Sequence, residues 1–242
     1  MQRFVVWFSC GAASAVAAKL AVEKYGSKCR IVYCDTLVSE HPDNARFGAD
    51  VERWVGKEIE VVRSSKYASI DEVFEKRRYM AGIKGAICTT EMKKIPREAW
   101  QREDDTHIFG YTVEEQRRAD NFENNNPGMS LEWLLIDAGV TKEDCLRLLR
   151  EAGIALPAMY SLGFEHNNCI GCVKSASTGY WNRVRRLFPE VFEKRVRQSR
   201  LLGVKLIKVK NERRFLDELP PDETDPDDDI ECGPVCQTPD TK

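Results

Sequence analysis

The start of the chain places the strongest constraint on its fold. Phe4–Phe8 is a short, continuous apolar run, which is typical of a buried strand in a parallel sheet. Small residues follow at once, and an alanine-rich stretch then runs with helical character from about Ser14 to Tyr25. A strand, a tight turn and a helix in this order form the first half of a βαβ unit, so we expect a parallel sheet.

Further segments extend this alternation. Strands are predicted at residues 30–34, 58–62 and 106–110, and helices at about 43–55 and 70–78. A stretch after Thr90 also reads as helical, although Pro96 is expected to break or bend it. Strands that alternate with helices indicate an α/β fold, a parallel wound sheet with right-handed crossovers.

The second half of the chain is predicted to be mainly helical. One helix opens at Thr141 and ends before Gly153, residues 162–174 read as a loop, and a basic helix starts at Pro189. Residues 217–231 then carry nine acidic side chains and no basic one, which is typical of a flexible linker. We therefore expect an α/β domain at 1–160, a helical part at 161–216 and a flexible acidic tail at 217–242.

Composition and the first residues indicate the cellular compartment of the protein. The 242 residues are 42% hydrophobic, no apolar run approaches a membrane span, and the first residues lack the features of a signal peptide. The expected location is the cytoplasm. Because reducing conditions there disfavour disulfides, clustered members of the nine cysteines indicate metal or redox chemistry.

The loop between the first strand and helix reads as a phosphate-binding loop. Its residues are Ser9-Cys10-Gly11-Ala12-Ala13-Ser14. Gly11 permits close backbone approach, the alanines leave amides exposed, and Ser9 and Ser14 add hydroxyl groups. Free amides at a helix N-terminus favour an anion. The alternative is an ordinary turn between a strand and a helix. Asp35 and Thr36 end the second predicted strand, where Asp35 is expected either to bind a ribose or base edge or to cap a turn.

Five cysteines lie in loop contexts. They are Cys88, Cys169, Cys172, Cys232 and Cys236. Two thiolates spaced as in Cys169-x-x-Cys172 chelate one metal ion or iron–sulfur cluster, and the spacing does not separate zinc from iron. Cys29, Cys34 and Cys145 fall in predicted strands or helices, where core packing is expected.

Five stretches, in order, carry a family resemblance. They are the phosphate loop, Tyr33-Cys34-Asp35-Thr36 with Glu40-His41-Pro42-Asp43, Cys88 to Pro96, Gly110 to Arg118, and Cys169-Ile170-Gly171-Cys172. In order and spacing they resemble the phosphoadenylyl-sulfate (PAPS) reductase family, in its phage and prophage-type branch, within the PP-loop or adenine nucleotide α-hydrolase-like superfamily. A phage-encoded member would work in the host cytoplasm.

The resemblance implies a set of nucleotide-binding and catalytic residues. The nucleotide contacts it implies are Ser9, Cys10, Gly11, Ala12, Ala13, Ser14, Asp35, Thr36, Lys94, Gly110 and Arg117. Lys93 and Arg118 are implied to stabilise sulfate and phosphate charge. Superfamily members that cleave ATP carry Asp where this chain has Ala13, so a sulfonucleotide such as PAPS is favoured over an ATP-like ligand.

The resemblance also implies a [4Fe-4S] cluster and a reactive tail. Thr89 replaces the second cysteine of the family's pair, which leaves Cys88, Cys169 and Cys172 as cluster ligands. The fourth ligand is either Cys236 or an open position, and zinc is the alternative metal. Glu231-Cys232-Gly233 resembles the family's nucleophile-bearing tail, without its histidine, so Cys232 is the expected nucleophile. The roles of the two tail cysteines are interchangeable on this basis.

Three functions are consistent with these features. The first is a PAPS-reductase-like enzyme that uses an external thiol such as thioredoxin. The second is a PP-loop enzyme that thiolates tRNA or introduces phosphorothioate into DNA; ten basic and two acidic residues between Arg183 and Lys210 favour nucleic acid as its partner. The third is a regulator that binds nucleotide or nucleic acid without turnover and keeps a structural cluster.

Overall fold

The computed structural model describes residues 2–82 and 85–226. Its centre is a five-stranded parallel sheet in the order β3-β2-β1-β6-β7. The strands are β1 (Phe4–Phe8), β2 (Cys29–Cys34), β3 (Ile59–Val62), β6 (Thr106–Ile108) and β7 (Ser130–Glu132). The predicted α/β fold with a parallel wound sheet is confirmed. The short strand β7 was not predicted from the sequence.

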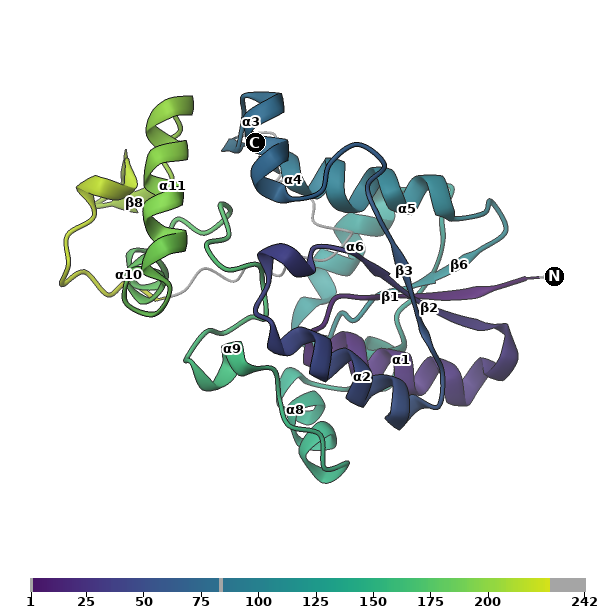
Figure 1. Cartoon of the computed structure of the whole chain (residues 1–242). Coiled ribbons are helices and arrows are strands. Elements are labelled where there is room, and N and C mark those ends of the chain that lie inside the picture. The colour runs from purple at the N-terminus through teal and green to yellow at the C-terminus, as the bar shows by residue number, and fades with distance from the viewer. Residues whose placement is uncertain (1, 83–84, 227–242) are drawn as a thin grey trace.

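Helices cover both faces of this sheet. They are α1 (Ala12–Tyr25), α2 (Asp43–Val55), α3 (Ile70–Arg77), α4 (Ile87–Thr89), α5 (Ile95–Trp100), α6 (Gln116–Asn124), α7 (Leu134–Asp137), α8 (Lys142–Glu151), α9 (Ala158–Ser161), α10 (Thr178–Leu187) and α11 (Pro189–Leu202). Figure 1 shows α1 and α2 on one face and α5 on the other, with α10 and α11 beyond one end of the strands. None of the helices in the described part of the chain is long and apolar enough to cross a membrane.

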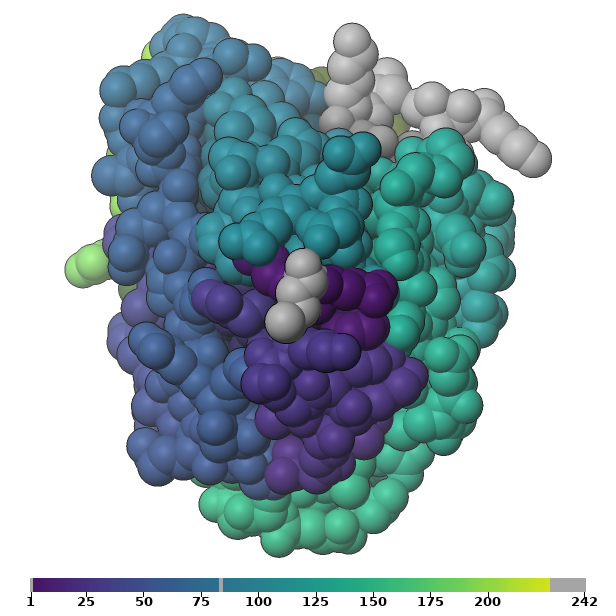
Figure 2. Space-filling model, turned by 90° about the vertical axis from the view of Figure 1, so that its right-hand side faces the viewer, coloured from purple at the N-terminus to yellow at the C-terminus, as the bar shows by residue number. Residues whose placement is uncertain are grey.

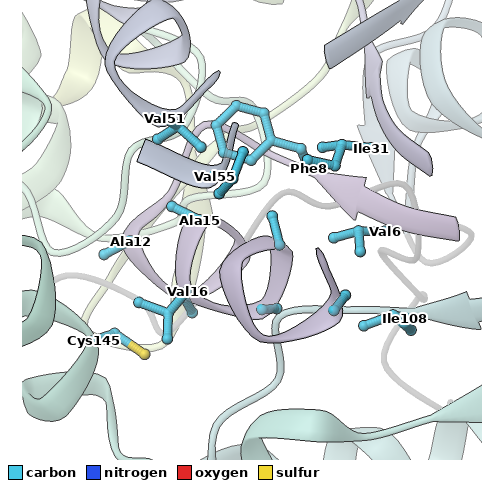
Figure 3. Packing of buried hydrophobic residues seen from close by; sticks show 14 of the residues in the cluster. Val6, Phe8, Ala12, Ala15, Val16, Ile31, Val51, Val55, Ile108 and Cys145 are labelled. Carbon is cyan, nitrogen blue, oxygen red and sulfur yellow. The ribbon is translucent and has the colours of Figure 1, made fainter. Parts of the chain in front are cut away.

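The alanines of α1 explain how closely this helix approaches the sheet. Val6 and Phe8 of β1 and Ile31 of β2 meet α1 on one face of the sheet (Figure 3). On its other side α1 packs against α8, through residues that include Cys145. A helix buried on two sides needs small side chains along most of its length, and every residue from Ala12 to Ala18 is buried.

A separate apolar cluster joins the C-terminal part to the middle of the chain. Phe74 of α3 and Met92 pack in it with Trp181 of α10 and Phe192 of α11. Two strands that the sequence did not predict, β8 (Ile207–Val209) and β9 (Glu212–Arg214), form a hairpin that contributes to the same cluster. The division of the chain at residue 160 stays a prediction, and this cluster spans that boundary.

The amino-terminal ends of the strands form the face opposite the site described below. Figure 2 shows this face, with the start of the chain (purple) at its centre and residues near 100 (teal) directly above it. Arg3 connects these segments by an ion pair and a cation–π contact. Its Nη2 lies 2.7 Å from Asp105 Oδ2, and its guanidinium carbon lies 4.6 Å from the centre of the Trp100 ring. Burial raises the pKa of Asp105, but its bonds to Arg3 and Arg102 outweigh this, so the carboxyl pKa is lowered overall.

Two local expectations need correction. Pro96 does not break the helical stretch, because it lies in the first turn of α5, where a missing N–H costs little; a π-helical segment, Thr90–Lys94, precedes it. Asp217 and Glu218 were expected in a structureless linker, but they form a 3-10 turn, Leu216–Glu218, and both pair with Arg200.

The segment after this turn is fastened to the start of α10. Ser177 and Thr178 donate side-chain hydrogen bonds to the backbone oxygen and the carboxylate of Asp225, both at 3.0 Å. Asn182 Nδ2 donates to the backbone oxygens of Pro220, at 2.9 Å, and Glu223, at 2.7 Å. The acidic segment therefore leaves the described structure from a defined place, at the N-terminus of α10.

Candidate functional site

The strand order places a switch point at the carboxyl ends of β1 and β6. The chain moves outward from β1 to β2 and β3, then returns to the other side of β1 at β6. In open parallel sheets the crevice at such a point is where ligands bind, because the two adjacent loops diverge there. The loop from Ser9 to Ser14 follows β1 at this position, as the sequence predicts.

The predicted phosphate loop forms the N-terminus of α1. The hydroxyl of Ser14 accepts hydrogen bonds from the backbone N–H and the hydroxyl of Ser9, both at 3.1 Å, and donates to the Gly11 carbonyl at 3.0 Å. In the described part of the chain, no side chain caps the first turn of α1, and that turn has no acidic residue. The first amides of α1 and its dipole are thus available to an anion.

The residue with an unusual backbone conformation in this loop is Cys10, not Gly11. Cys10 has a φ of 58°, whereas Gly11 has a φ of −95° and a ψ of 161°. A Cβ at residue 11 would lie 3.6 Å from Ser9 Oγ and 3.8 Å from the Tyr160 hydroxyl, in ordinary van der Waals contact. Gly11 therefore leaves open space beside the loop, and Tyr160 of α9 lies at the border of that space.

Gly110 brings the end of β6 directly against the phosphate loop. A Cβ at this position would lie 2.6 Å from Ser14 N and 2.8 Å from Ala13 C. Both are backbone atoms, which cannot rotate away. The segment after β6 approaches the start of α1 this closely only because residue 110 has no side chain.

A buried polar network supports the loop from the side of β2. Glu40 accepts hydrogen bonds from the Tyr33 hydroxyl at 2.9 Å, from Thr36 Oγ1 at 2.5 Å and from Asn44 Nδ2 at 2.7 Å. Asn167 Nδ2 extends the network to Asn44 Oδ1, at 2.8 Å. Burial, with the nearby Glu40 charge, raises the pKa of the Tyr33 hydroxyl, which therefore stays protonated. Apart from Thr36, these residues were not predicted as part of a site.

Lys93 brings positive charge to the same region. Its side chain is buried, whereas Lys94 is exposed. Burial raises the pKa of Cys10, and Glu40 adds to that effect, while Lys93 opposes it. Burial also raises the pKa of Cys34 to about 11, again opposed by Lys93, and the Cys34 thiol donates to the Lys93 carbonyl at 3.6 Å. Cys10 and Cys34 are therefore neutral thiols near pH 7, and Lys93 is the inward-facing cation.

The two arginines after β6 differ in their surroundings. Arg117 is exposed on α6. Arg118 pairs with Glu115, and its guanidinium carbon lies 4.9 Å from the centre of the Tyr111 ring. A ligand that recruits Arg118 would have to compete with this carboxylate.

A cavity of about 300 Å³ opens beyond β2 and β3. Its lining includes Asp35, Thr36, Arg63, Ser64, Tyr67 and Met92. Asp35 accepts hydrogen bonds from the Leu37 amide at 3.1 Å and from Arg63 Nε at 2.8 Å. The carboxylate thus caps a turn, one of the two expected roles, and also faces a cavity large enough for part of a small ligand.

Cys169 and Cys172 lie around a buried tyrosine. The Tyr180 hydroxyl accepts a hydrogen bond from the Cys172 amide at 2.7 Å and donates to the Cys169 carbonyl at 3.4 Å. Cys169 and Cys172 belong to the apolar cluster that joins the C-terminal part to the middle of the chain, and the half-buried Cys88 packs against that cluster.

Within residues 2–82 and 85–226, no group of three or more His, Cys, Asp or Glu side chains is arranged to hold a metal ion. Cys232 and Cys236, the expected nucleophile and fourth ligand, lie outside the described residues. The described residues by themselves therefore do not fit a four-thiolate cluster, and no reaction step is derived through one.

The basic stretch from Arg183 to Lys210 is partly used within the protein. Arg195 is buried and pairs with Asp71, and Arg200 pairs with Asp217 and Glu218. Arg185 donates to the Leu219 carbonyl at 3.0 Å. The charge that this stretch offers to a nucleic acid is smaller than its sequence indicates.

Comparisons with known proteins give a distant likeness to a solved structure. No family model matches the sequence, and no curated protein matches it. Among solved structures, the chain is similar to the crystal structure of phosphoadenylyl-sulfate (PAPS) reductase from Candida auris in a phosphate complex. The identity is 12%, the TM-score is 0.49, and the match covers 68% of this chain and 80% of that one. A likeness this distant establishes neither family nor activity.

Proposed function

We propose that this protein binds an adenine sulfonucleotide at the loop from Ser9 to Ser14 and acts in sulfur transfer or reduction, as a PAPS-reductase-like enzyme. The observation that carries the proposal is the uncapped start of α1 at the switch point of a parallel sheet. The buried Lys93 supplies a cation near this loop, and the sequence motifs point to the same ligand class.

The reaction proposed is attack of the Cys232 thiolate on the sulfur of PAPS. An S–S bond forms as the S–O bond to the nucleotide breaks, which releases adenosine 3′,5′-bisphosphate and leaves a thiosulfonate on Cys232. A dithiol protein such as thioredoxin then reduces this adduct, so that sulfite leaves and the dithiol becomes a disulfide. Lys93 stabilises the anionic groups of the nucleotide, and Arg118 contributes only if it exchanges Glu115 for the ligand.

Substitution of Gly11 by valine tests the binding site. The φ and ψ of residue 11 suit a β-branched side chain, and its surroundings have room, so we expect the fold to persist. The side chain would block approach to the amides, and loss of two charge-assisted hydrogen bonds weakens binding by about 100-fold. Calorimetry with PAPS measures this loss.

The control is Gly128→Val, because Gly128 is exposed and a Cβ there would have no neighbour within 4 Å among the described residues. Binding of PAPS to Gly11→Val with the affinity of the unaltered protein would rule out the loop as the site. Tight PAPS binding without sulfite release in the presence of a dithiol would favour the non-catalytic regulator. Binding that requires ATP together with RNA or DNA would favour the nucleic-acid-modifying enzyme.

We also propose that Cys88, Cys169 and Cys172 bind an iron–sulfur cluster. The proposal rests on the resemblance of the sequence motifs. The three thiols would have to converge on binding, because the described residues hold no group of three or more ligand side chains arranged for a metal ion. Protein prepared without oxygen should contain iron and acid-labile sulfide, and Cys172→Ala should lose both. Cys29→Ala, a change at a buried cysteine of β2, should retain them. Stoichiometric zinc without sulfide would establish the zinc alternative.

A further inference from the structure

The phosphate loop holds one residue in a conformation that its side chain disfavours. The φ of Cys10 is 58°, in the left-handed region that glycine adopts without steric cost. A residue with a Cβ stays in this region only where neighbouring contacts hold it there. A contact from outside the loop is therefore needed to hold Cys10.

The contact comes from a residue far along the chain. Asn167 Nδ2 donates hydrogen bonds to the Cys10 carbonyl at 2.7 Å and to Asn44 Oδ1 at 2.8 Å. Asn167 is 7% exposed, and its Oδ1 atom is buried with no hydrogen-bond partner among the described residues. The amide orientation is determined by its two acceptors, because a reversed amide would place oxygen against oxygen.

The residues around Asn167 are themselves joined by hydrogen bonds. Its partner Asn44 is fixed by Glu40, which takes three hydrogen bonds at the carboxyl end of β2. The Ile170 amide donates to the Ser39 carbonyl at 2.9 Å, which fixes the same loop at a second point. The loop that carries Cys169 and Cys172 is thus bound to the phosphate loop at Cys10 and to the segment after β2 at Ser39 and Asn44.

We propose that Asn167 is a positioning residue for the phosphate loop. By holding the Cys10 carbonyl, it keeps Cys10 in the left-handed conformation and so maintains the loop shape that presents the first amides of α1 to an anion. The inference rests on the proposed nucleotide site. It predicts that PAPS binding depends less on Asn167 when residue 10 is glycine, which adopts a positive φ without steric cost.

A double-substitution experiment tests this dependence. Asn167→Ala should weaken PAPS binding, measured by calorimetry, about tenfold. Cys10→Gly in the same chain should restore the affinity to within about threefold of the unaltered protein. Cys10→Ala is the matched control, because it removes the same thiol but keeps the Cβ, and it should not restore binding. Unchanged binding in Asn167→Ala, or equal recovery with glycine and alanine, would overturn the inference.

Thermal unfolding of the same proteins without nucleotide separates this inference from the proposed function. Asn167→Ala should lower the unfolding temperature less in the Cys10→Gly background than in the Cys10→Ala background. If the unaltered protein binds no nucleotide, the proposed function fails, and this difference between the backgrounds still decides the role of Asn167. Equal losses of unfolding temperature in both backgrounds would refute the inference whether or not nucleotide binds.

Discussion

Gly110→Ala is expected to lower the free energy of unfolding by about 3 kcal/mol and to abolish nucleotide binding. The new Cβ would lie 2.6 Å from Ser14 N and 2.7 Å from Ser14 Cα. Because both are backbone atoms of α1, either this helix or the end of β6 must move. A shift of α1 displaces the amides that the proposed nucleotide site uses. Chemical denaturation measures the first effect, and calorimetry with PAPS measures the second.

Gly48→Ala is the matched control for this substitution. Gly48 lies within α2, and in the described part of the chain an added Cβ there would have no tertiary neighbour within 4 Å. Alanine has the higher helix propensity, so the free energy of unfolding should rise by up to about 1 kcal/mol. If Gly110→Ala unfolds at the same denaturant concentration as the unaltered protein, the segment after β6 does not approach the backbone of α1 as closely as described here.

The protein is expected to lose about 3 kcal/mol of stability as the pH falls from 6.5 to 4, through His107 alone. Burial lowers the pKa of His107 to about 4; Arg97 and Arg3 add to this, and Asp105 opposes it. His107 Nδ1 accepts a hydrogen bond from Trp7 Nε1 at 3.0 Å, so the folded state requires neutral imidazole. Below pH 6.5 the unfolded chain binds a proton that the folded protein does not. The stability is therefore complete above pH 6.5 and declines toward pH 4.

His107→Asn isolates this contribution. The asparagine oxygen can accept from Trp7 Nε1, and it does not titrate in this range. Urea denaturation at several pH values should give the variant a flatter stability profile between pH 6.5 and 4 than the unaltered protein. Other groups titrate in both proteins, so the difference between the two profiles reports His107. Parallel profiles would mean that His107 is not buried as a neutral side chain.

The position of the phosphate loop could be predicted from the sequence, but its internal geometry could not. An apolar strand, small residues and an alanine-rich helix are local features, and they placed the loop at the start of α1. The sequence predicts that Gly11 permits close backbone approach, but it does not predict the positive φ of Cys10. The Cys10 carbonyl accepts a hydrogen bond from Asn167, a side chain far along the chain.

Contacts over long sequence distances account for most of what the sequence did not predict. Asn167 lies 157 residues from Cys10 and 123 from Asn44, and no local pattern connects them. The strand β7 has three residues, too few for a clear period of alternation. The acidic composition after Leu216 predicted a flexible linker, but Asp217 and Glu218 have partners on Arg200 that composition does not reveal.

The attachment of Asp225 to the start of α10 acts as the fixed end of a tether. Tyr180, on the first turn of that helix, contacts the backbone at both Cys169 and Cys172. Five residues lie between Pro226 and Cys232, and the six Cα–Cα steps of an extended chain span at most about 22 Å. A group on so short a tether meets its surroundings at an effective concentration of the order of millimolar. If Cys232 reacts with Cys169 or Cys172, that step would therefore be first-order in protein, and diluting the protein would not slow it.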